Sequence, residues 1–301
     1  MTGAGVPGVY GLRLIGLRPN EDLLARVDPG APGLTVHRTA APPALPPEDH
    51  RNAGLVLREL IDGAGTMAMW LDARRVEFAL TATLSDDELV HPWLAPAAAA
   101  MALRDGRLAM HGGVLEVDGR CIALVGDREA GKSTLVAAAA MDGIGVLTDD
   151  VVVVDDDLAV HAGPRCIDLR PASAGYFAAK AAVPARGGTR RRLPLPQTLA
   201  RAPLAAVVVL GWGPVRPLRR LRGTESLAAL LPHLASDRAP TSFGQVLALA
   251  SRPVFALSRP KEWSLLPATL ERLVRLAASS DGPEQSEGVP VADRHPFGRF
   301  T

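Results

Sequence analysis

The chain has 301 residues, of which 48% are hydrophobic and 22% charged, so it can bury a sizeable core and is not disordered as a whole. Its 33 Lys and Arg residues balance 32 Asp and Glu, and a net charge of +1 gives no global attraction to nucleic acid or to an anionic membrane. The two cysteines, Cys121 and Cys166, are too few for a disulfide scaffold and lack metal-site spacing, which fits a reducing compartment. No apolar stretch reaches the roughly 18 residues of a spanning helix, and the N-terminus lacks a signal-peptide pattern. We therefore expect a cytoplasmic protein that binds neither nucleic acid nor membrane.

The first hundred residues consist of short apolar or alternating runs separated by turns rich in Pro, Gly and Asp. This pattern predicts a small β-rich domain over residues 1–104. Near its end, Ser85 and Glu88 have the spacing of a capping box, and the apolar stretch through Leu103 predicts a helix. The segment 279–301 is polar and rich in Pro and Gly, so we expect a disordered tail there. Residues 105–278 form the predicted second domain.

The second domain begins with a predicted hairpin. Strands are expected over 108–117 and 120–125, joined by Asp118-Gly119, a dipeptide suited to the positive φ angles of a tight turn. The second strand leads into a glycine-rich loop, a helix over 135–141 and a further strand from 146. This βαβ pattern predicts a buried parallel pair of strands within an α/β domain.

The glycine-rich loop matches G-x-x-x-x-G-K-[ST] at every fixed position. Its backbone N–H groups and the N-terminus of the next helix would cradle phosphates, with Lys132 on the β- and γ-phosphates and the Ser133 hydroxyl on Mg²⁺. A chance match in a Gly-rich chain is the alternative, and the apolar strand before the loop and the helix after it argue against chance. The loop therefore predicts binding of ATP with Mg²⁺ through Gly126, Asp127, Arg128, Glu129, Ala130, Gly131, Lys132, Ser133 and Thr134.

Two adjacent acids, Asp149 and Asp150, end the strand that follows the loop helix, which places them at the edge of the sheet where the loop lies. One acid would hold Mg²⁺ and the other, its pKa raised by its neighbour, would accept a proton from an attacking hydroxyl. We favour Asp149 as the metal ligand with Ser133 and Asp150 as the base, although spacing does not orient the two. His111 opens the hairpin, and spacing alone leaves its position relative to the phosphates open.

Together, the His-Gly-Gly strand from His111, the loop at 126–134 and the strand that ends in Asp149-Asp150 resemble the catalytic domain of the HPr kinase/phosphorylase family. Residues 108–170, about a fifth of the chain, carry this resemblance. The pattern is most similar to the shorter HPr-kinase-like serine kinases that act on ribosomally made peptides of the lasso type. The resemblance implies an α/β fold, with a P-loop kinase core of HPr-kinase type and a smaller β-rich N-terminal unit. It also implies that His111 is a partner of the acidic pair.

The resemblance further implies ATP-dependent phosphoryl transfer to a serine hydroxyl of a peptide or small protein, such as the C-terminal Ser of a lasso-type precursor peptide. Lys132, Asp149, Asp150 and His111 would be the catalytic residues. No E-I-R-G-type segment is present, which argues against HPr itself as the acceptor. Two alternatives stay open: a small-metabolite kinase with the same core, and a nucleotide-binding regulatory or assembly protein with little catalysis. The sequence is compatible with a homo-oligomer and does not name the acceptor.

A basic loop is predicted around Arg190-Arg191-Arg192, and these side chains are candidates to contact phosphate or an acidic peptide. A solvated charged loop is the alternative. Arg165 and Arg170 are weaker candidates for the same role. The remaining histidines are predicted to be incidental to function: His37, His50, His91, His161, His233 and His295.

Overall fold

The computed structural model describes residues 5–44, 54–60, 63–177, 182–196, 198–235 and 243–279. Within these ranges the chain is a mixed α/β protein with three sheets. None of the described helices is both long enough and apolar enough to span a membrane. The predicted tail at 279–301 lies, apart from Ser279, outside the described residues.

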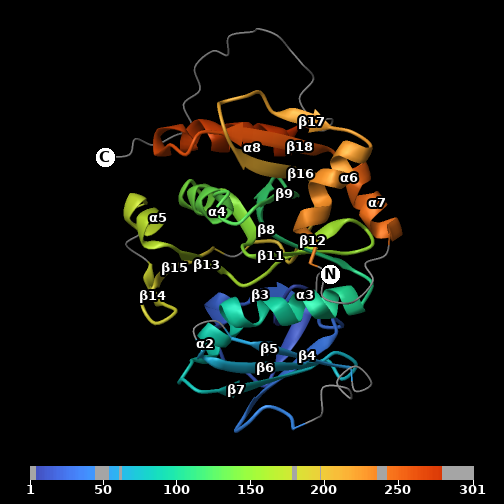
Figure 1. Ribbon diagram of the computed structural model, residues 1–301, viewed down its shortest axis with the longest axis vertical. Helices are drawn as coiled ribbons and strands as arrows, with labels where there is room; N and C mark the ends of the chain where they lie inside the picture. The colour runs from blue at the N-terminus through green and yellow to red at the C-terminus, as the bar shows by residue number, and fades with distance from the viewer. Residues whose placement is uncertain are drawn as a thin grey trace.

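A seven-stranded sheet in the order β3-β1-β2-β4-β7-β6-β5 forms the N-terminal part of the protein, at the bottom of Figure 1. Its strands are β1 Val6–Val9, β2 Leu12–Ile15, β3 Ala25–Val27, β4 Gly33–Thr39, β5 Leu55–Glu59, β6 Gly65–Trp70 and β7 Arg75–Leu80. The capping box of Ser85 and Glu88 is confirmed, and it begins helix α2 (Asp86–Glu88). The predicted single helix through Leu103 is wrong, because a turn at Leu89–Trp93 with non-helical backbone at His91 separates α2 from α3 (Ala95–Arg104).

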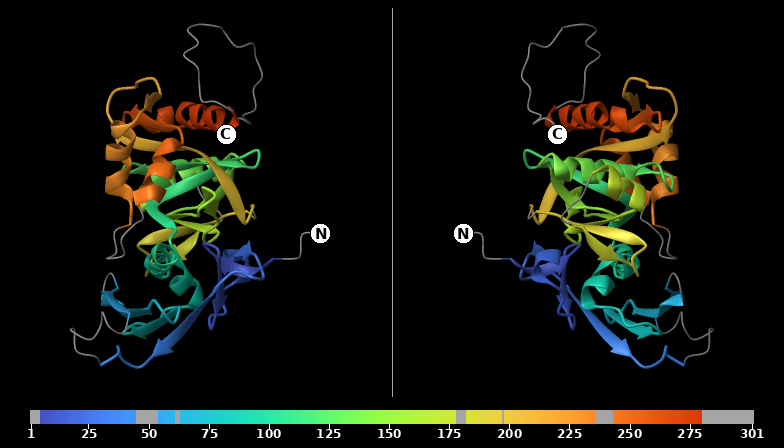
Figure 2. Two further views of the ribbon diagram at one scale, coloured as in Figure 1. Left: turned by 90° about the vertical axis from the view of Figure 1, so that its right-hand side faces the viewer. Right: turned by 90° about the vertical axis from the view of Figure 1, so that its left-hand side faces the viewer.

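An eight-stranded sheet forms the centre of the second part. Its strands are β8 Leu108–Val117, β9 Arg120–Gly126, β10 Gly145–Thr148, β11 Val151–Val154, β12 Ala159–His161, β16 Arg201–Trp212, β17 Arg219–Leu221 and β18 Val254–Arg259. Helices α4 (Lys132–Met141) and α8 (Leu266–Ala278) share a buried core on one face, and α6 (Thr224–Leu230) and α7 (Phe243–Ser251) share a core on the other. Figures 1 and 2 show the resulting sandwich, with α3 between the large sheet and the N-terminal sheet.

The hairpin of β8 and β9 is confirmed, with Val117 paired to Arg120 and positive φ angles at Asp118 and Gly119. The expected direct pairing of the strands on either side of the loop helix is wrong. Both β9 and β10 pair antiparallel with β8, so they run parallel to each other with β8 between them. All three strands are mostly buried on both faces, and such apolar runs do not reveal which strands are neighbours.

A small third sheet in the order β13-β15-β14 lies beside α5 (Pro171–Tyr176). Its strands are β13 Cys166–Leu169, β14 Val183–Ala185 and β15 Arg190–Pro194. The segment expected to be a basic loop is therefore a strand, in which Arg192 is buried while Arg191 is exposed. This sheet extends from the large sheet toward the N-terminal part of the protein.

Candidate functional site

The glycine-rich loop connects the carboxyl end of β9 to the first turn of α4. Gly126 and Gly131 have φ angles of 149° and 85°, which side-chain-bearing residues rarely adopt. A Cβ atom on Gly126 would lie 2.7 Å from the carbonyl oxygen of Leu210, and one on Gly131 would lie 2.4 Å from Nη2 of Arg259. Gly126 is thus required by its backbone conformation and by close packing against backbone, and Gly131 by its backbone conformation.

Lys132 lies inside the loop and is only 6% exposed. Its Nζ donates to the carbonyl oxygens of Gly126 at 2.7 Å and Asp127 at 2.9 Å. Burial lowers the pKa of Lys132, and the nearby charges of Asp149 and Asp127 oppose that shift. Because an ammonium group bonds more strongly to an anion than to a neutral carbonyl, this lysine is poised to bind an anion that enters the loop.

The acidic pair and the His-Gly-Gly segment face each other across one antiparallel ladder. Strands β10 and β11 both pair with β8, with Thr148 opposite Val114 and Val151 opposite His111. Between these pairs, the N–H of Gly112 donates to the carbonyl oxygen of Asp150 at 3.1 Å. The two acids therefore lie opposite two glycines, and the spacing of the sequence alone did not reveal this pairing.

Gly113 leaves room for the first acid. A Cβ atom at this position would lie 3.3 Å from Oδ1 of Asp149 and 2.5 Å from a methyl group of Val136 in α4. Asp149 is 5% exposed, and its carboxyl group lies close enough to the side chain of Ser133 in the loop for that hydroxyl to lower its pKa. Burial, and then the charge of Asp150, raise the pKa of Asp149 to about 7.

The second acid pairs with the histidine instead. Nδ1 of His111 lies 2.8 Å from the carbonyl oxygen of Asp150 and 3.3 Å from its Oδ1. Burial by itself would raise the pKa of Asp150, but the hydrogen bond from His111 and the nearby charges of His91 and Arg186 lower it on balance. The pKa of His111 is raised, chiefly by its hydrogen bond to Asp150. The expectation that the base has its pKa raised by its neighbour is thus wrong for Asp150, because the raised value belongs to Asp149.

A buried ion-pair cluster around Asp168, called the floor of the site below, lies near Asp150 and was not predicted from the sequence. Both carboxylate oxygens of Asp168 are bonded to Arg192, at 2.8 and 3.1 Å, and Nε of Arg186 donates to the same carboxylate at 2.9 Å. Arg192 also donates to the carbonyl oxygens of Asp87 and His91, which connects β15 to the N-terminal part of the chain. Arg192 is therefore a structural residue and is not free to contact phosphate. A lone acid in the apolar strand β13 was the available signal, because a buried charge requires a partner.

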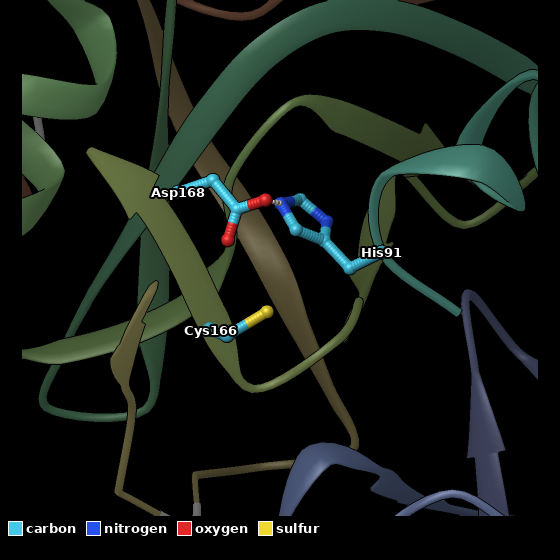
Figure 3. Close-up of side chains that lie close together, drawn as sticks. All are labelled: His91, Cys166 and Asp168. Atoms are coloured by element: carbon cyan, nitrogen blue, oxygen red, sulfur yellow. Dashed lines mark ion pairs between the residues drawn. The ribbon is translucent and has the colours of Figure 1, made fainter. Parts of the chain in front are cut away.

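His91 and Cys166 complete this cluster, and Figure 3 shows both side chains gathered around Asp168. The three ligand atoms lie within 4.8 Å of one another, a separation that a metal ion could bridge. However, both oxygens of Asp168 already accept hydrogen bonds from arginine, and burial raises the pKa of the Cys166 thiol. Burial also lowers the pKa of His91. Two guanidinium groups against the carboxylate would repel a cation, so we interpret the cluster as an ion pair with structural neighbours.

Tyr10, which directly follows strand β1 of the N-terminal sheet, lies near Asp150. Its ring is 1% exposed, and its backbone N–H donates to the carbonyl oxygen of Ala162 at 2.6 Å. Burial raises the pKa of Tyr10, and the charge of Asp150 raises it further. A residue of the N-terminal part therefore lies near the acidic pair, which no local pattern in the sequence indicated.

Some of the other residues considered from the sequence lie at the loop, and others lie away from it. Arg170 forms an exposed ion pair with Glu129 of the loop at 2.6 Å, so the structure brings it to the site. Thr134 Oγ1 lies 3.3 Å from the hydroxyl of Ser173 in α5. In contrast, Arg165 donates to the carbonyl oxygen of Leu195, and His161 pairs with Asp155 at 2.9 Å, on the far side of the ladder from the loop.

A cavity of about 260 Å³ opens beside His111 and the first half of the loop. His233, on the segment that follows α6, lies in its wall, so this predicted incidental histidine is at the site. Most of the remaining wall is apolar and includes Ala99 of α3. The full set of lining residues is Ala99, Met110, His111, Gly126, Asp127, Arg128, Val151, Pro232, His233, Leu234 and Ala235.

No model of a known protein family matches this sequence, and no curated protein matches it. Among solved structures, the HPr(Ser) kinase/phosphatase from Coxiella burnetii is similar, with 15% sequence identity over 56% of this chain and 88% of that chain, at a TM-score of 0.32. Similarity at this level assigns neither a fold family nor an activity. The function proposed below therefore rests on the geometry of this chain.

The residues present fit a divalent cation. Ser133 and Asp149 lie close to each other and offer a hydroxyl and a carboxylate, the oxygen ligands that Mg²⁺ prefers. Asp149 is a buried acid beside a second acid, and a cation there would relieve the repulsion between them. Lys132 bonds only to neutral loop carbonyls through its Nζ, so its ammonium group could bind anionic phosphates.

Proposed function

We propose that this chain is an ATP-dependent phosphotransferase of the HPr-kinase-like type, which transfers a phosphoryl group to a serine hydroxyl of a peptide or small protein. The observation that carries this proposal is the pair of Asp150 and His111, 3.3 Å apart, at the residue next to the buried Asp149. His111, the partner of Asp150, lines the cavity together with Gly126, Asp127 and Arg128 of the loop. We take the loop as the donor site and the cavity as the acceptor site.

The loop binds the triphosphate of the donor. Its backbone N–H groups and the ammonium group of Lys132 stabilise negative charge on the phosphoryl group in transit. Ser133 and Asp149 would hold Mg²⁺, which supplies further neutralisation of the phosphate oxygens when bound.

The acceptor hydroxyl enters the cavity beside His111. Its oxygen forms a bond to the γ-phosphorus, the bond from that phosphorus to the β–γ bridging oxygen breaks, and the hydroxyl proton passes to the carboxylate of Asp150. His111 holds that carboxylate through Nδ1 and keeps it ionised, because it lowers the pKa of Asp150. The products are ADP and a phosphoserine.

The acceptor could also be a small hydroxyl compound, and the size of the cavity supports this second candidate. A volume of about 260 Å³ with a largely apolar wall accommodates a small molecule or the end of a chain, but not a folded surface. A peptide acceptor would therefore present its serine near a terminus or in an extended segment, as the C-terminal Ser of a lasso-type precursor does.

The direct test is phosphoryl transfer from γ-labelled ATP by the full chain with Mg²⁺. Short peptides with an internal or a C-terminal Ser, the same peptides with Ala in place of Ser, and small hydroxyl compounds would be offered separately. We expect label on one Ser or hydroxyl class and none on the Ala peptides. Binding of ATP without transfer to any acceptor would favour a regulatory nucleotide-binding protein instead, and no binding would contradict both.

A further inference from the structure

Trp212 and Arg259 end two strands that run parallel to the loop strand. Leu210 of β16 pairs with Gly126, and two residues later Trp212 pairs with Arg259 of β18. Both side chains thus lie at the carboxyl edge of the parallel strands, where open α/β sheets bind their ligands. Neither residue matches a motif in the sequence.

Both side chains are bonded to the second half of the loop. Nε1 of Trp212 donates to the carbonyl oxygen of Glu129 at 3.0 Å, and Nη2 of Arg259 donates to that of Ala130, also at 3.0 Å. The guanidinium carbon of Arg259 lies 4.1 Å from the centre of the indole ring. The ring is therefore fixed beside the loop by a hydrogen bond at its edge and by a cation against one face.

The indole ring is nevertheless 40% exposed to solvent. A large aromatic ring that is immobilised and still open to water has the properties of a stacking platform, because every nucleobase offers a flat π face. Arg259 lies against one face of the ring, and Nζ of Lys261 lies 6.0 Å from the ring centre, so a ligand would reach the part of the ring that these two cations leave exposed.

Arg259 is 7% exposed, and among the described residues no carboxylate lies within ion-pair distance of it. Its Nε has no hydrogen-bond partner there, and burial lowers its pKa to about 10. A buried cation without an anion is costly, so its contacts with the ring and with the loop must account for its position. We interpret Arg259 as the support that holds Trp212 against the loop.

The two ends of the loop have different neighbours. His111 and the cavity flank Gly126, Asp127 and Arg128, whereas Trp212 flanks the stretch from Glu129 to Gly131. If transfer occurs at the cavity end, as the proposed function requires, the part of the nucleotide remote from the transferred group extends toward Trp212.

We propose that the exposed face of Trp212 stacks against the base of the bound nucleoside triphosphate, with Arg259 as its support. This proposal rests on the proposed function, because it takes the loop to bind a nucleoside triphosphate. It assigns base contacts to a residue outside the phosphate loop and predicts that affinity for the base and affinity for the phosphates are separable.

The test compares two ligands, Mg·ATP and Mg·tripolyphosphate, by isothermal titration of the full chain. Trp212→Leu is expected to weaken binding of ATP about 5- to 150-fold, the range that corresponds to stacking energies of about 1–3 kcal/mol, while tripolyphosphate binds within about 2-fold of wild type. Trp212→Phe keeps a ring without the indole N–H and should lose less ATP affinity than the Leu variant. It also serves as the test if Trp212→Leu does not fold.

Trp263→Leu is the matched control, because Trp263 is also 40% exposed but is already stacked on Tyr176, with ring centres 4.3 Å apart. It should bind both ligands like wild type. Three results would contradict stacking on Trp212. They are an equal loss of affinity for both ligands in Trp212→Leu, an unchanged affinity for ATP in that variant, and a loss of affinity specific to ATP in Trp263→Leu. If wild type binds neither ligand, the proposed function itself is overturned, and the platform with it.

Discussion

At the phosphate loop, the ammonium group of Lys132 has backbone carbonyls as its hydrogen-bond partners, whereas in the floor of the site two arginines hold the carboxylate of Asp168. Both charges are buried, but only the second has an opposite charge at hydrogen-bond distance. A buried charge held by neutral groups can still gain energy from a ligand, while a charge that is already paired cannot. The comparison therefore assigns ligand binding to the loop and stability to the floor.

The largest expected effect is on the loop side. Lys132→Met keeps most of the aliphatic stem and removes the charge, so we expect phosphoryl transfer to fall by at least about 10²–10³-fold, as for loss of one transition-state hydrogen-bond donor. The melting temperature should change little, because the lysine bonds only to two loop carbonyls. Transfer rates measured beside thermal melts by circular dichroism would check this. Near-normal transfer by the variant would contradict the assignment of the loop.

Substitution in the floor should lower the stability of the protein and leave nucleotide binding intact. Asp168→Asn leaves Arg192 and Arg186 without their carboxylate, and breaking a buried ion pair typically costs about 3–5 kcal/mol of unfolding free energy. Chemical denaturation at neutral pH measures this cost. The variant should still bind Mg·ATP at temperatures where it is folded, and a stability like that of wild type would show that the cluster does not support the fold.

The stabilisation that Asp168 provides should depend on pH. Burial alone would raise the pKa of Asp168, but its hydrogen bond with Arg192 and the nearby positive charges lower it below its value in the unfolded chain. A lowered pKa in the folded state means that the stabilisation is present above the unfolded pKa of about 4 and is lost as pH falls below it. The difference in unfolding free energy between wild type and Asp168→Asn should thus be constant from about pH 7 to 5 and shrink at more acid pH. A constant difference down to about pH 3 would contradict this.

The smallest effect is expected at the exposed ion pair of Arg170 and Glu129. Both side chains are about half exposed, and exposed pairs of this kind contribute little to stability. Arg170→Gln should leave the melting temperature unchanged within error. If it lowered the melting temperature as much as Asp168→Asn does, burial would not be what separates the two regions.

The loop and the floor also differ in how well the sequence predicts them. The phosphate loop is built from consecutive residues, so its glycines, Lys132 and Ser133 could be identified from spacing alone. The contact of Asp150 with His111 depends on the pairing of β10 and β11 with β8, which needs the fold. Long-range partners such as Tyr10 and Trp212 have no local pattern, because only the packing of distant segments brings them to the site.

The corrections to the predicted elements have the same origin. The position of β8 between β9 and β10 could not be predicted from the sequence. Buried strands are apolar on both faces, so their sequences do not indicate which strands pair with each other. Residues Arg190–Pro194 form a strand and not the predicted basic loop, and Arg192 is buried on Asp168. A charge run therefore gives little information about burial when an opposite charge lies far away in the sequence.

Asp149 and Asp150 are assigned different roles in the proposed reaction, and single substitutions at each test this assignment most directly. Titration of Mg·ATP and single-turnover transfer to the acceptor would be measured for Asp149→Asn, Asp150→Asn and His111→Ala. We expect Asp149→Asn to require more Mg²⁺ and to weaken Mg·ATP binding, because Asp149 is buried close to Ser133 of the loop. Asp150→Asn and His111→Ala should bind Mg·ATP nearly like wild type but transfer more slowly, with Asp150→Asn reduced by about 10²–10⁴-fold. If all three variants bind and transfer like wild type, the account of this site as a phosphotransferase is wrong.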